Sequence, residues 1–229
     1  MSLLLSIETS SEVGSIAIHK EGELIFYKEN LREKSHSENI AQLIKSAYDE
    51  LGLLISETEY VAISKGPGSY TGLRIGTSIA KGICYGSDAS LISVGTLEAM
   101  AAEYLSDNPV KKVLCPMLDA RRMEVYCQLF DSEMEPITPV EARVIDEHSF
   151  QEILKEGGVV FFGSGSTKCE SIIKHSNASF DGGRYPKASF IGHIALSKIR
   201  AGEFEDVAYF EPFYLKEFIA KKPSKKNMV

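Results

Sequence analysis

The residues most suited to anion binding lie at 66–76, with the sequence GPGSYTGLRIG. An apolar run of strand length (60–64) precedes them, and small apolar residues at helical spacing (77–85) follow. This pattern predicts a strand, a tight turn and the start of a helix, where backbone amides could cradle a phosphate. The alternative is structural, because Gly72 and Gly76 share one helix face and would let another element pack closely. Glycine spacing alone leaves both interpretations open.

Two further turns could bind phosphate. Thr9 and Ser10 follow the first predicted strand, and Gly163 and Gly165 follow a later one. Both turns could offer backbone amides. Glu8 would repel phosphate at the first turn unless a Mg²⁺ lay between them, and the second turn lacks the lysine and the spacing of a Walker A loop. A strand-ending turn is the preferred interpretation of each, with Thr9, Ser10, Gly163 and Gly165 kept as candidate nucleotide ligands.

The sequence has no pattern typical of a metal centre or of nucleophilic catalysis. A helical metal site needs two ligands on one face, but the residue four positions after His36 is Ile40, and no other histidines are close in sequence. There is no G-x-S-x-G motif, and the four cysteines have no neighbouring histidine. We therefore predict no catalytic residue, no metal and no resident cofactor.

Two groups of charged residues have more than one interpretation. Arg74 lies one turn into the glycine-rich helix, where it could pair with a carboxylate or bind an anion. Asp119, Arg121 and Arg122 lie in a polar turn between two predicted strands. A solvated turn is the preferred interpretation there, with contact to a partner as the second.

Composition restricts the class of partner. The net charge is −7, from 25 basic and 32 acidic residues, so RNA contact would require a local basic patch or a partner protein. The cysteines form no C-x-x-C pair, the first residues contain no basic leader, and no apolar run approaches the ~20 residues of a membrane span. These features predict a cytoplasmic protein without membrane contact.

The order of predicted elements is β-β-β-α-β-α, and a similar order begins again after residue 108. We expect two α/β lobes, 1–108 and 109–229, each with a mixed sheet flanked by helices, the second ending in a flexible basic tail. In the first lobe the expected strands are 3–7, 14–19, 24–27, 60–64 and 90–94, and the expected helices are 37–51, 71–86 and 95–104. In the second, the expected strands are 113–118, 125–130, 142–145, 159–162 and 213–215, the helices 149–155, 167–174 and 189–201, and a loop covers 177–186.

With these segments in view, the chain resembles the TsaB (YeaZ) family, relatives of the threonylcarbamoyl-transferring TsaD (Kae1) proteins. The resemblance rests on four segments: LSIETSS at 5–11, HSE at 36–38, the glycine stretch at 66–76 and PMLDARRMEVY at 116–126. It implies an actin/Hsp70-like (ASKHA) fold. It also implies a non-catalytic role in a complex that installs N6-threonylcarbamoyladenosine at position 37 of tRNA, with TsaD as partner, the ATPase TsaE recruited, and tRNA bound only through the complex.

The resemblance leaves an enzymatic alternative, a stand-alone metallopeptidase-like protein or an ASKHA ATPase. The catalytic relatives carry paired metal-binding histidines on the first helix, and Ile40 breaks that pair here. Glu8 stands where related ATPases have Asp, which weakens the case for independent ATP hydrolysis.

The two first-lobe helices are the expected partner surface, and the chain alone is expected to form a homodimer through it. Each helix has apolar or small residues on two faces, one for its own sheet and one for a partner. The interface residues we predict are His36, Leu43, Ala47, Gly72, Arg74, Gly76 and Ile79.

Overall fold

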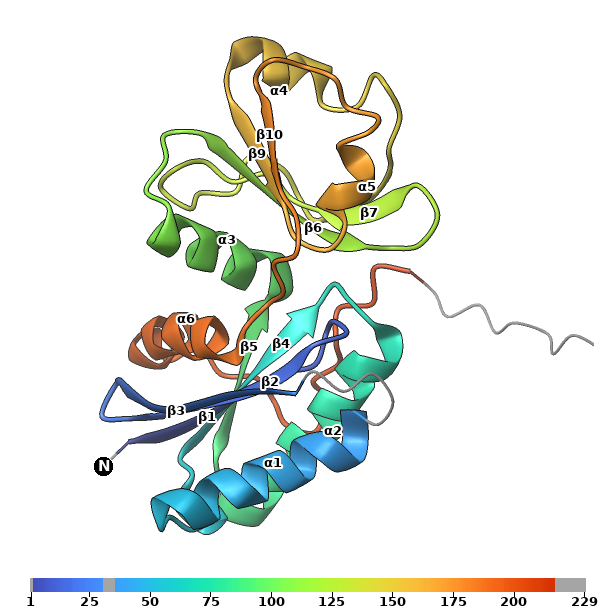
Figure 1. Ribbon diagram of the computed structural model, residues 1–229. Helices are drawn as coiled ribbons and strands as arrows, with labels where there is room; N and C mark the ends of the chain where they lie inside the picture. The colour runs from blue at the N-terminus through green and yellow to red at the C-terminus, as the bar shows by residue number, and fades with distance from the viewer. Residues whose placement is uncertain (1, 31–35, 217–229) are drawn as a thin grey trace, which may run out of the picture.

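The computed structural model describes residues 2–30 and 36–216, which form two lobes stacked along one axis (Figure 1). Each lobe is built on a five-stranded mixed sheet, in the orders β3-β2-β1-β4-β5 and β10-β9-β6-β7-β8. The fold class expected from the sequence, a two-lobed ASKHA-like α/β protein, is confirmed.

The first sheet combines an antiparallel meander with a parallel half. β1 (Leu3–Glu8), β2 (Gly14–Lys20) and β3 (Glu23–Asn30) pair antiparallel, while β4 (Tyr60–Gly66) and β5 (Ser90–Gly95) run parallel to β1. Parallel strands require crossover connections, and helices supply them here. The crossover helices are α1 (His36–Leu51), followed by a short 3₁₀ turn, η1 (Ile55–Glu57), and α2 (Tyr70–Ser87), while α3 (Thr96–Asp107) leads from β5 to the second sheet.

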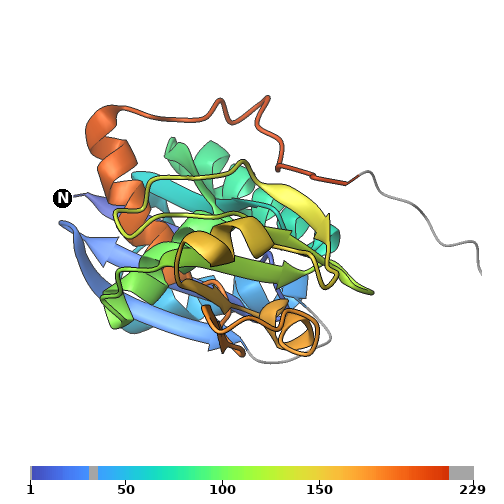
Figure 2. The same ribbon diagram turned by 90° about the horizontal axis from the view of Figure 1, so that it is seen from above.

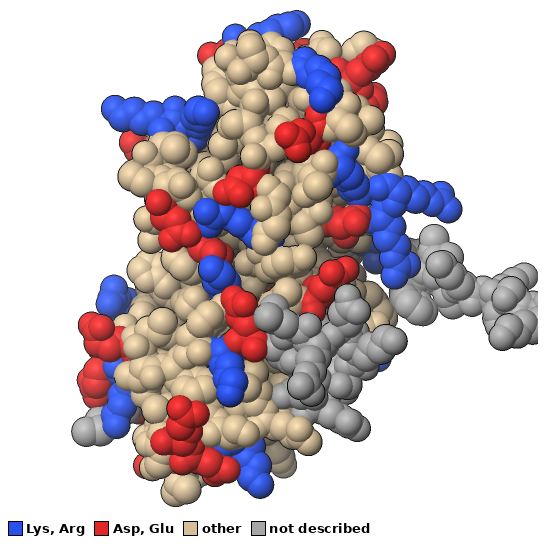
Figure 3. Space-filling view, in the orientation of Figure 1, with Lys and Arg blue, Asp and Glu red and all other residues tan. Residues whose placement is uncertain are grey.

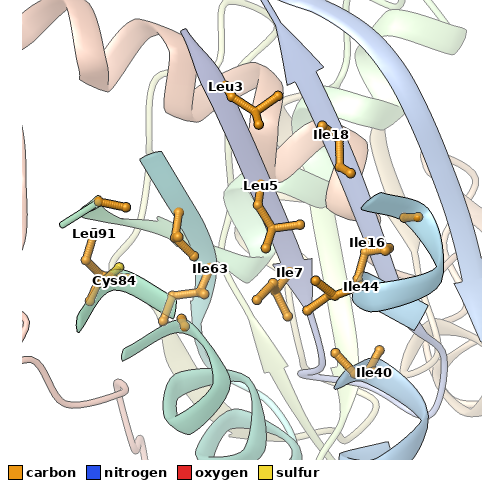
Figure 4. Close-up of a cluster of buried hydrophobic side chains, with 14 of the residues drawn as sticks. Leu3, Leu5, Ile7, Ile16, Ile18, Ile40, Ile44, Ile63, Cys84 and Leu91 are labelled. Carbon is orange, nitrogen blue, oxygen red and sulfur yellow. The ribbon is translucent and has the colours of Figure 1, made fainter. Parts of the chain in front are cut away.

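The core of the first lobe lies between its sheet and the pair α1 and α2. Leu5, Ile7 and Ile16 from the strands meet Ile40 and Ile44 from α1, and all five side chains are almost completely buried (Figure 4). The apolar spacing of residues 40–51 thus covers one sheet face, as the periodicity predicts.

The second lobe repeats the same plan with shorter elements. β6 (Val113–Asp119), β7 (Glu124–Cys127) and β8 (Glu141–Val144) pair antiparallel, and β9 (Val159–Phe162) and β10 (Ala178–Asp181) run parallel to β6. α4 (Gln151–Glu156) and α5 (Ser166–Cys169) complete it, and α3 packs against its sheet through Leu97, Met100 and Tyr104.

Several expected elements differ in the structure. The predicted loop at 177–186 contains β10, because Ala178–Asp181 pairs in parallel with the whole length of β9, a partner that the sequence does not reveal. The predicted strand 125–130 ends at Cys127, and the helix predicted over 167–174 is a single turn. The edge strand expected at 213–215 does not form, although the Phe213 amide donates one hydrogen bond to the Lys65 carbonyl (2.7 Å).

The predicted division at residue 108 separates the two sheets but not the two lobes. α6 (Ala188–Ala201) returns to the first sheet, where Ile191 and Ala195 pack on Leu4, Ala62 and Ile92. Residues 202–216 then run along the β5 side of that sheet as a strap, which Figure 2 shows in red beside the molecule. The assignment of all residues after 108 to the second lobe is therefore wrong, because buried apolar contacts place 188–216 on the first.

Among residues 2–30 and 36–216, every helix is too short or too polar to cross a bilayer.

Candidate functional site

The β1–β2 turn lies against the N-terminal turn of α2. β1 and β4 are parallel neighbours, so their carboxyl ends meet at one edge of the sheet, with Glu8 at the end of β1 and Ser64 near the end of β4. Ligands of α/β proteins bind at such an edge. The candidate residues Thr9 and Ser10 and the glycine stretch predicted from the sequence are thus brought together here.

The polar groups of this turn bond to the chain itself. The Thr9 hydroxyl donates to the Gly72 carbonyl (2.8 Å), and the Ser69 amide donates to the Ser10 carbonyl (2.6 Å). The Ser10 amide donates to Glu8 Oε1 (2.5 Å). The two donors that a bound phosphate would use are therefore engaged within the chain, the Thr9 hydroxyl with α2 and the Ser10 amide with Glu8.

The paired glycines predicted to receive a partner helix face this turn. A Cβ at Gly72 would lie 1.9 Å from the Thr9 carbonyl oxygen, and one at Gly76 would lie 2.3 Å from Thr9 Oγ1. Both glycines are buried. The expectation that they form an open seam for another subunit is therefore wrong, since the close neighbour is the chain's own β1–β2 turn.

Glu8 is the most unusual group at this edge. Its side chain is fully buried, and desolvation raises the pKa of its carboxyl, against the opposing effect of the Ser10 amide and of the nearby Ser10 and Ser64 side chains. Its Oε2 and the Ser10 and Ser64 hydroxyls have no hydrogen-bond partner among the described residues. Within residues 2–30 and 36–216, no three His, Cys, Asp or Glu side chains come together in a way that could hold a metal ion.

The second candidate turn is packed in a similar way inside its own lobe. Gly163 has φ +98°, and a Cβ there would lie 2.5 Å from the Met117 carbonyl oxygen. A Cβ at Gly165 would lie 2.9 Å from Val125 Cγ1. These glycines let the β9–α5 turn approach β6 and β7, which accounts for them without a ligand.

The remaining predicted interface residues differ in how exposed they are. Ala47 is fully buried in the first-lobe core, so it cannot contact a partner, while Leu43 and Ile79 are half-buried at the edge of that core. Arg74 is exposed, with its guanidinium carbon 5.5 Å from the centre of the Tyr70 ring. The His36 side chain lies outside the part of the chain whose side chains the structure describes.

The open face of α2 carries residues that are not among the interface residues predicted from the sequence. Tyr85 is 90% exposed, and the neighbouring Gly82 and Gly86 have nothing within 4 Å of an added Cβ. Gly82 sits inside a helix, where glycine costs about 1 kcal/mol relative to alanine. The sequence could have pointed to this face, because helical spacing places Gly82 and Tyr85 on a different side of the helix from Gly72 and Gly76.

The turn between β6 and β7, residues 119–124, is held by a lysine that the sequence reading missed. Lys168 on α5 donates to Asp119 Oδ1 (2.5 Å) and to the carbonyls of Arg122 (2.8 Å) and Glu124 (2.7 Å). Arg121 and Arg122 both have positive φ, +69° and +50°, which is uncommon outside glycine. The turn is solvent-exposed at Arg121 and Arg122, as the sequence predicts, and in addition its backbone is held by hydrogen bonds from Lys168.

Comparisons with known proteins agree with this fold. Residues 30–226 match the model of the TsaD family, described as tRNA N6-adenosine threonylcarbamoyltransferase. The Escherichia coli protein named tRNA threonylcarbamoyladenosine biosynthesis protein TsaB is 29% identical over 225 residues, 96% of each chain. The Haemophilus influenzae protein of the same name is 34% identical over 123 residues, which span 54% of this chain and about half (51%) of that protein.

Solved structures show the same architecture. The structure titled YeaZ from Pseudomonas aeruginosa superposes with a TM-score of 0.81 at 23% identity, covering 94% of this chain and all (100%) of that one. A second Pseudomonas aeruginosa structure, titled as an uncharacterized protein with similarity to peptidase YEAZ, gives a TM-score of 0.84 at 22% identity. At this identity the structural likeness establishes the fold, and the sequence matches establish the kinship. The chain belongs to the TsaD family, and within it to the TsaB/YeaZ group.

Proposed function

We propose that this chain is a non-catalytic subunit in the biosynthesis of threonylcarbamoyladenosine in tRNA, and that the open face of α2 beside α1 binds a catalytic TsaD-family subunit. The names of the curated relatives supply the pathway. The observation that carries the binding role is the Gly82, Tyr85 and Gly86 face, which is exposed and free of intramolecular contacts that would require glycine.

This face has the chemistry of a helix-docking surface. Glycines without side chains permit close approach of a second helix, and an exposed tyrosine supplies a large, rigid contact area. Gly82 lowers the stability of the helix relative to alanine, and no contact inside the monomer requires a glycine there. Burial of this face in a complex would offset that loss of stability.

The β1–β2 turn supports the non-catalytic part of the proposal. The Thr9 hydroxyl and the Ser10 carbonyl form hydrogen bonds with the start of α2, so the turn contributes to the packing of the first lobe. Recruitment of TsaE, binding of tRNA through the assembled complex, and formation of a homodimer when the partner is absent all belong to this proposal.

Light scattering after size-exclusion chromatography tests the partner surface. The full chain is mixed with the TsaD-family subunit from the same source, as wild type, as Gly82→Glu, and as Ser197→Glu, a control on the exposed face of α6. We expect the wild type and the control to form a complex, and Gly82→Glu to bind at least about 10-fold more weakly, because a buried unpaired carboxylate is costly.

The same samples separate a local effect from unfolding and from the enzymatic alternative. Circular dichroism should show all three proteins folded. No complex with the wild type would overturn the proposed function, and an intact Gly82→Glu complex would remove α2 from the interface. ATP turnover by the pure chain, lost on substitution of Ser10, would instead favour an ATPase.

A further inference from the structure

A line of basic and aromatic side chains crosses from the first lobe to the second near the end of the described chain. We call it the basic–aromatic strip, and it consists of Arg74, Tyr70, Tyr214, Lys216, Arg121 and Arg122. The Arg74 guanidinium lies 5.5 Å from the centre of the Tyr70 ring, which lies 4.8 Å from the centre of the Tyr214 ring. Lys216 then contacts Glu124, at the base of the β6–β7 tip.

Two carboxylates along the strip form ion pairs with lysines, whereas three of its cations, the arginines, form none within the described residues. Asp119 is bound by Lys168, and Glu124 by Lys216. No ion pair within the described residues involves Arg74, Arg121 or Arg122. Glu211 also lies near the Tyr214 ring and, within the described residues, is in no ion pair, so it offsets one of the three arginine charges. The strip is thus locally cationic in a chain of net charge −7.

The tip that presents two of these arginines is held in a fixed shape. Lys168 ties the carbonyls of Arg122 and Glu124 to Asp119, and the Arg121 amide donates to Asp119 Oδ1 (2.7 Å). Positive φ at both arginines costs free energy that these bonds offset. A group presented in a fixed geometry loses less conformational freedom when it binds.

The layout of the strip favours an extended polyanion over a small anion. Its cations are distributed along a line across two lobes, whereas a single phosphate requires donors that converge on one point. Tyr214 is 36% exposed and Phe213 beside it is 42% exposed, so aromatic surface alternates with charge. Cations that follow a backbone together with aromatic rings that accept bases are typical of single-stranded nucleic-acid surfaces.

The sequence beyond the strip has the same sign of charge. Four lysines, Lys221, Lys222, Lys225 and Lys226, follow Lys216, against one acidic residue, Glu217. In Figure 3, Lys and Arg side chains also gather at the right-hand edge of the second lobe, while the rest of the visible face mixes both signs. The sequence directly after the strip therefore carries a net positive charge.

We propose that the basic–aromatic strip binds the sugar–phosphate backbone of an RNA, with Arg121 and Arg122 on phosphates and the tyrosine pair against an unpaired base. This proposal rests on the proposed function, in which the RNA is the tRNA of the modification complex. It extends that function by giving this acidic subunit a direct share of substrate binding, on a surface distinct from the Gly82 and Tyr85 face.

The test measures RNA affinity with matched loss of charge. Arg121→Gln/Arg122→Gln is compared with Lys155→Gln/Arg200→Gln, which removes two exposed cations from α4 and α6. Complex formation with the TsaD-family subunit is measured first, and fluorescence anisotropy with labelled tRNA follows from about 50 to 200 mM salt. The full chain alone is titrated with the same tRNA at about 50 mM salt.

We expect the tip variant to weaken tRNA binding about 10-fold relative to the control variant. The negative slope of the log association constant against log salt concentration should become shallower by about 1.4–1.8, because two phosphate contacts are lost. If no complex forms with the wild type, the proposed function fails. The RNA-binding role of the strip is then tested by titrating the tip variant and the control variant, each without a partner, with the same tRNA. Equal tRNA affinity of the two variants would overturn the proposal, as would a tip variant that weakened only the protein complex.

Discussion

Thr9 Oγ1 donates a hydrogen bond to the carbonyl of Gly72 at 2.8 Å, and Gly72 has no room for a side chain on that side. This contact joins the turn after the first strand to the first turn of α2. Thr9 belongs to the predicted anion site and Gly72 to the predicted partner surface. The structure places the two residues in contact with each other.

Gly72→Ala should destabilise the fold. A Cβ at residue 72 would lie 1.9 Å from the Thr9 carbonyl oxygen, so the turn or the helix has to move. Overpacking of this kind costs roughly 3 kcal/mol. Gly82→Ala, on the open face of the same helix, should raise stability by up to about 1 kcal/mol through helix propensity. Urea denaturation compares the two, and equal or reversed effects would refute the packing role of Gly72.

Glu8→Gln should change how stability depends on pH. Burial raises the pKa of the Glu8 carboxyl above its ordinary value of 4.5, so the folded protein holds this proton more tightly than the unfolded chain. Stability of the wild type should therefore fall as pH rises from about 4.5 through the folded pKa. Glu8→Gln removes this term, so its advantage over the wild type should grow with pH.

Thermal melts between acid and neutral pH measure this difference. Glu50→Gln, at an exposed position on α1, is the control and should follow the wild-type profile. A gap between Glu8→Gln and the wild type that does not change with pH would contradict the buried titration.

Lys168→Met should loosen the β6–β7 tip. The ammonium group of Lys168 makes three hydrogen bonds there, and its side chain is 21% exposed, so solvent screens it only in part. We expect a loss of about 2 kcal/mol, as for hydrogen bonds to a charged group. Hydrogen exchange at the Ala120 and Glu124 amides should quicken.

The matched control for this variant is Lys174→Met, which removes one exposed contact to the Glu170 carbonyl and should stay within about 0.5 kcal/mol of the wild type. Unchanged exchange at the tip in Lys168→Met would show that the hairpin keeps its shape without the lysine.

Phe210→Ala should show that the strap is part of the first lobe. Phe210 is 8% exposed within the first-lobe core, while its neighbour Tyr209 is 85% exposed. Loss of a buried phenylalanine costs about 3 kcal/mol or more, whereas Tyr209→Ala should cost under about 0.5 kcal/mol. Denaturation curves with the same slope for both variants allow a direct comparison, and equal midpoints would place the strap outside the core.

The sequence by itself determined the fold class and most of its elements. Alternating and continuous apolar runs predicted the three-strand meander, β4, β5 and β9, and helical spacing predicted α1, α2 and α6, because burial of one face imposes a period on the chain. The motifs at 5–11, 66–76 and 116–126 also indicated the family, which the comparisons confirm. The absence of a second histidine four positions after His36, where Ile40 stands, is also evident from the sequence alone.

Tertiary structure alone decided which neighbour each face meets. Gly72 and Gly76 suit either a partner or the chain's own turn, and only the position of Thr9 shows that the turn is already there. The same holds for α6, whose apolar face would fit either sheet, and for β10, which forms because β9 offers it an edge. Local pattern specifies that a surface must be covered, while the long-range path of the chain specifies what covers it.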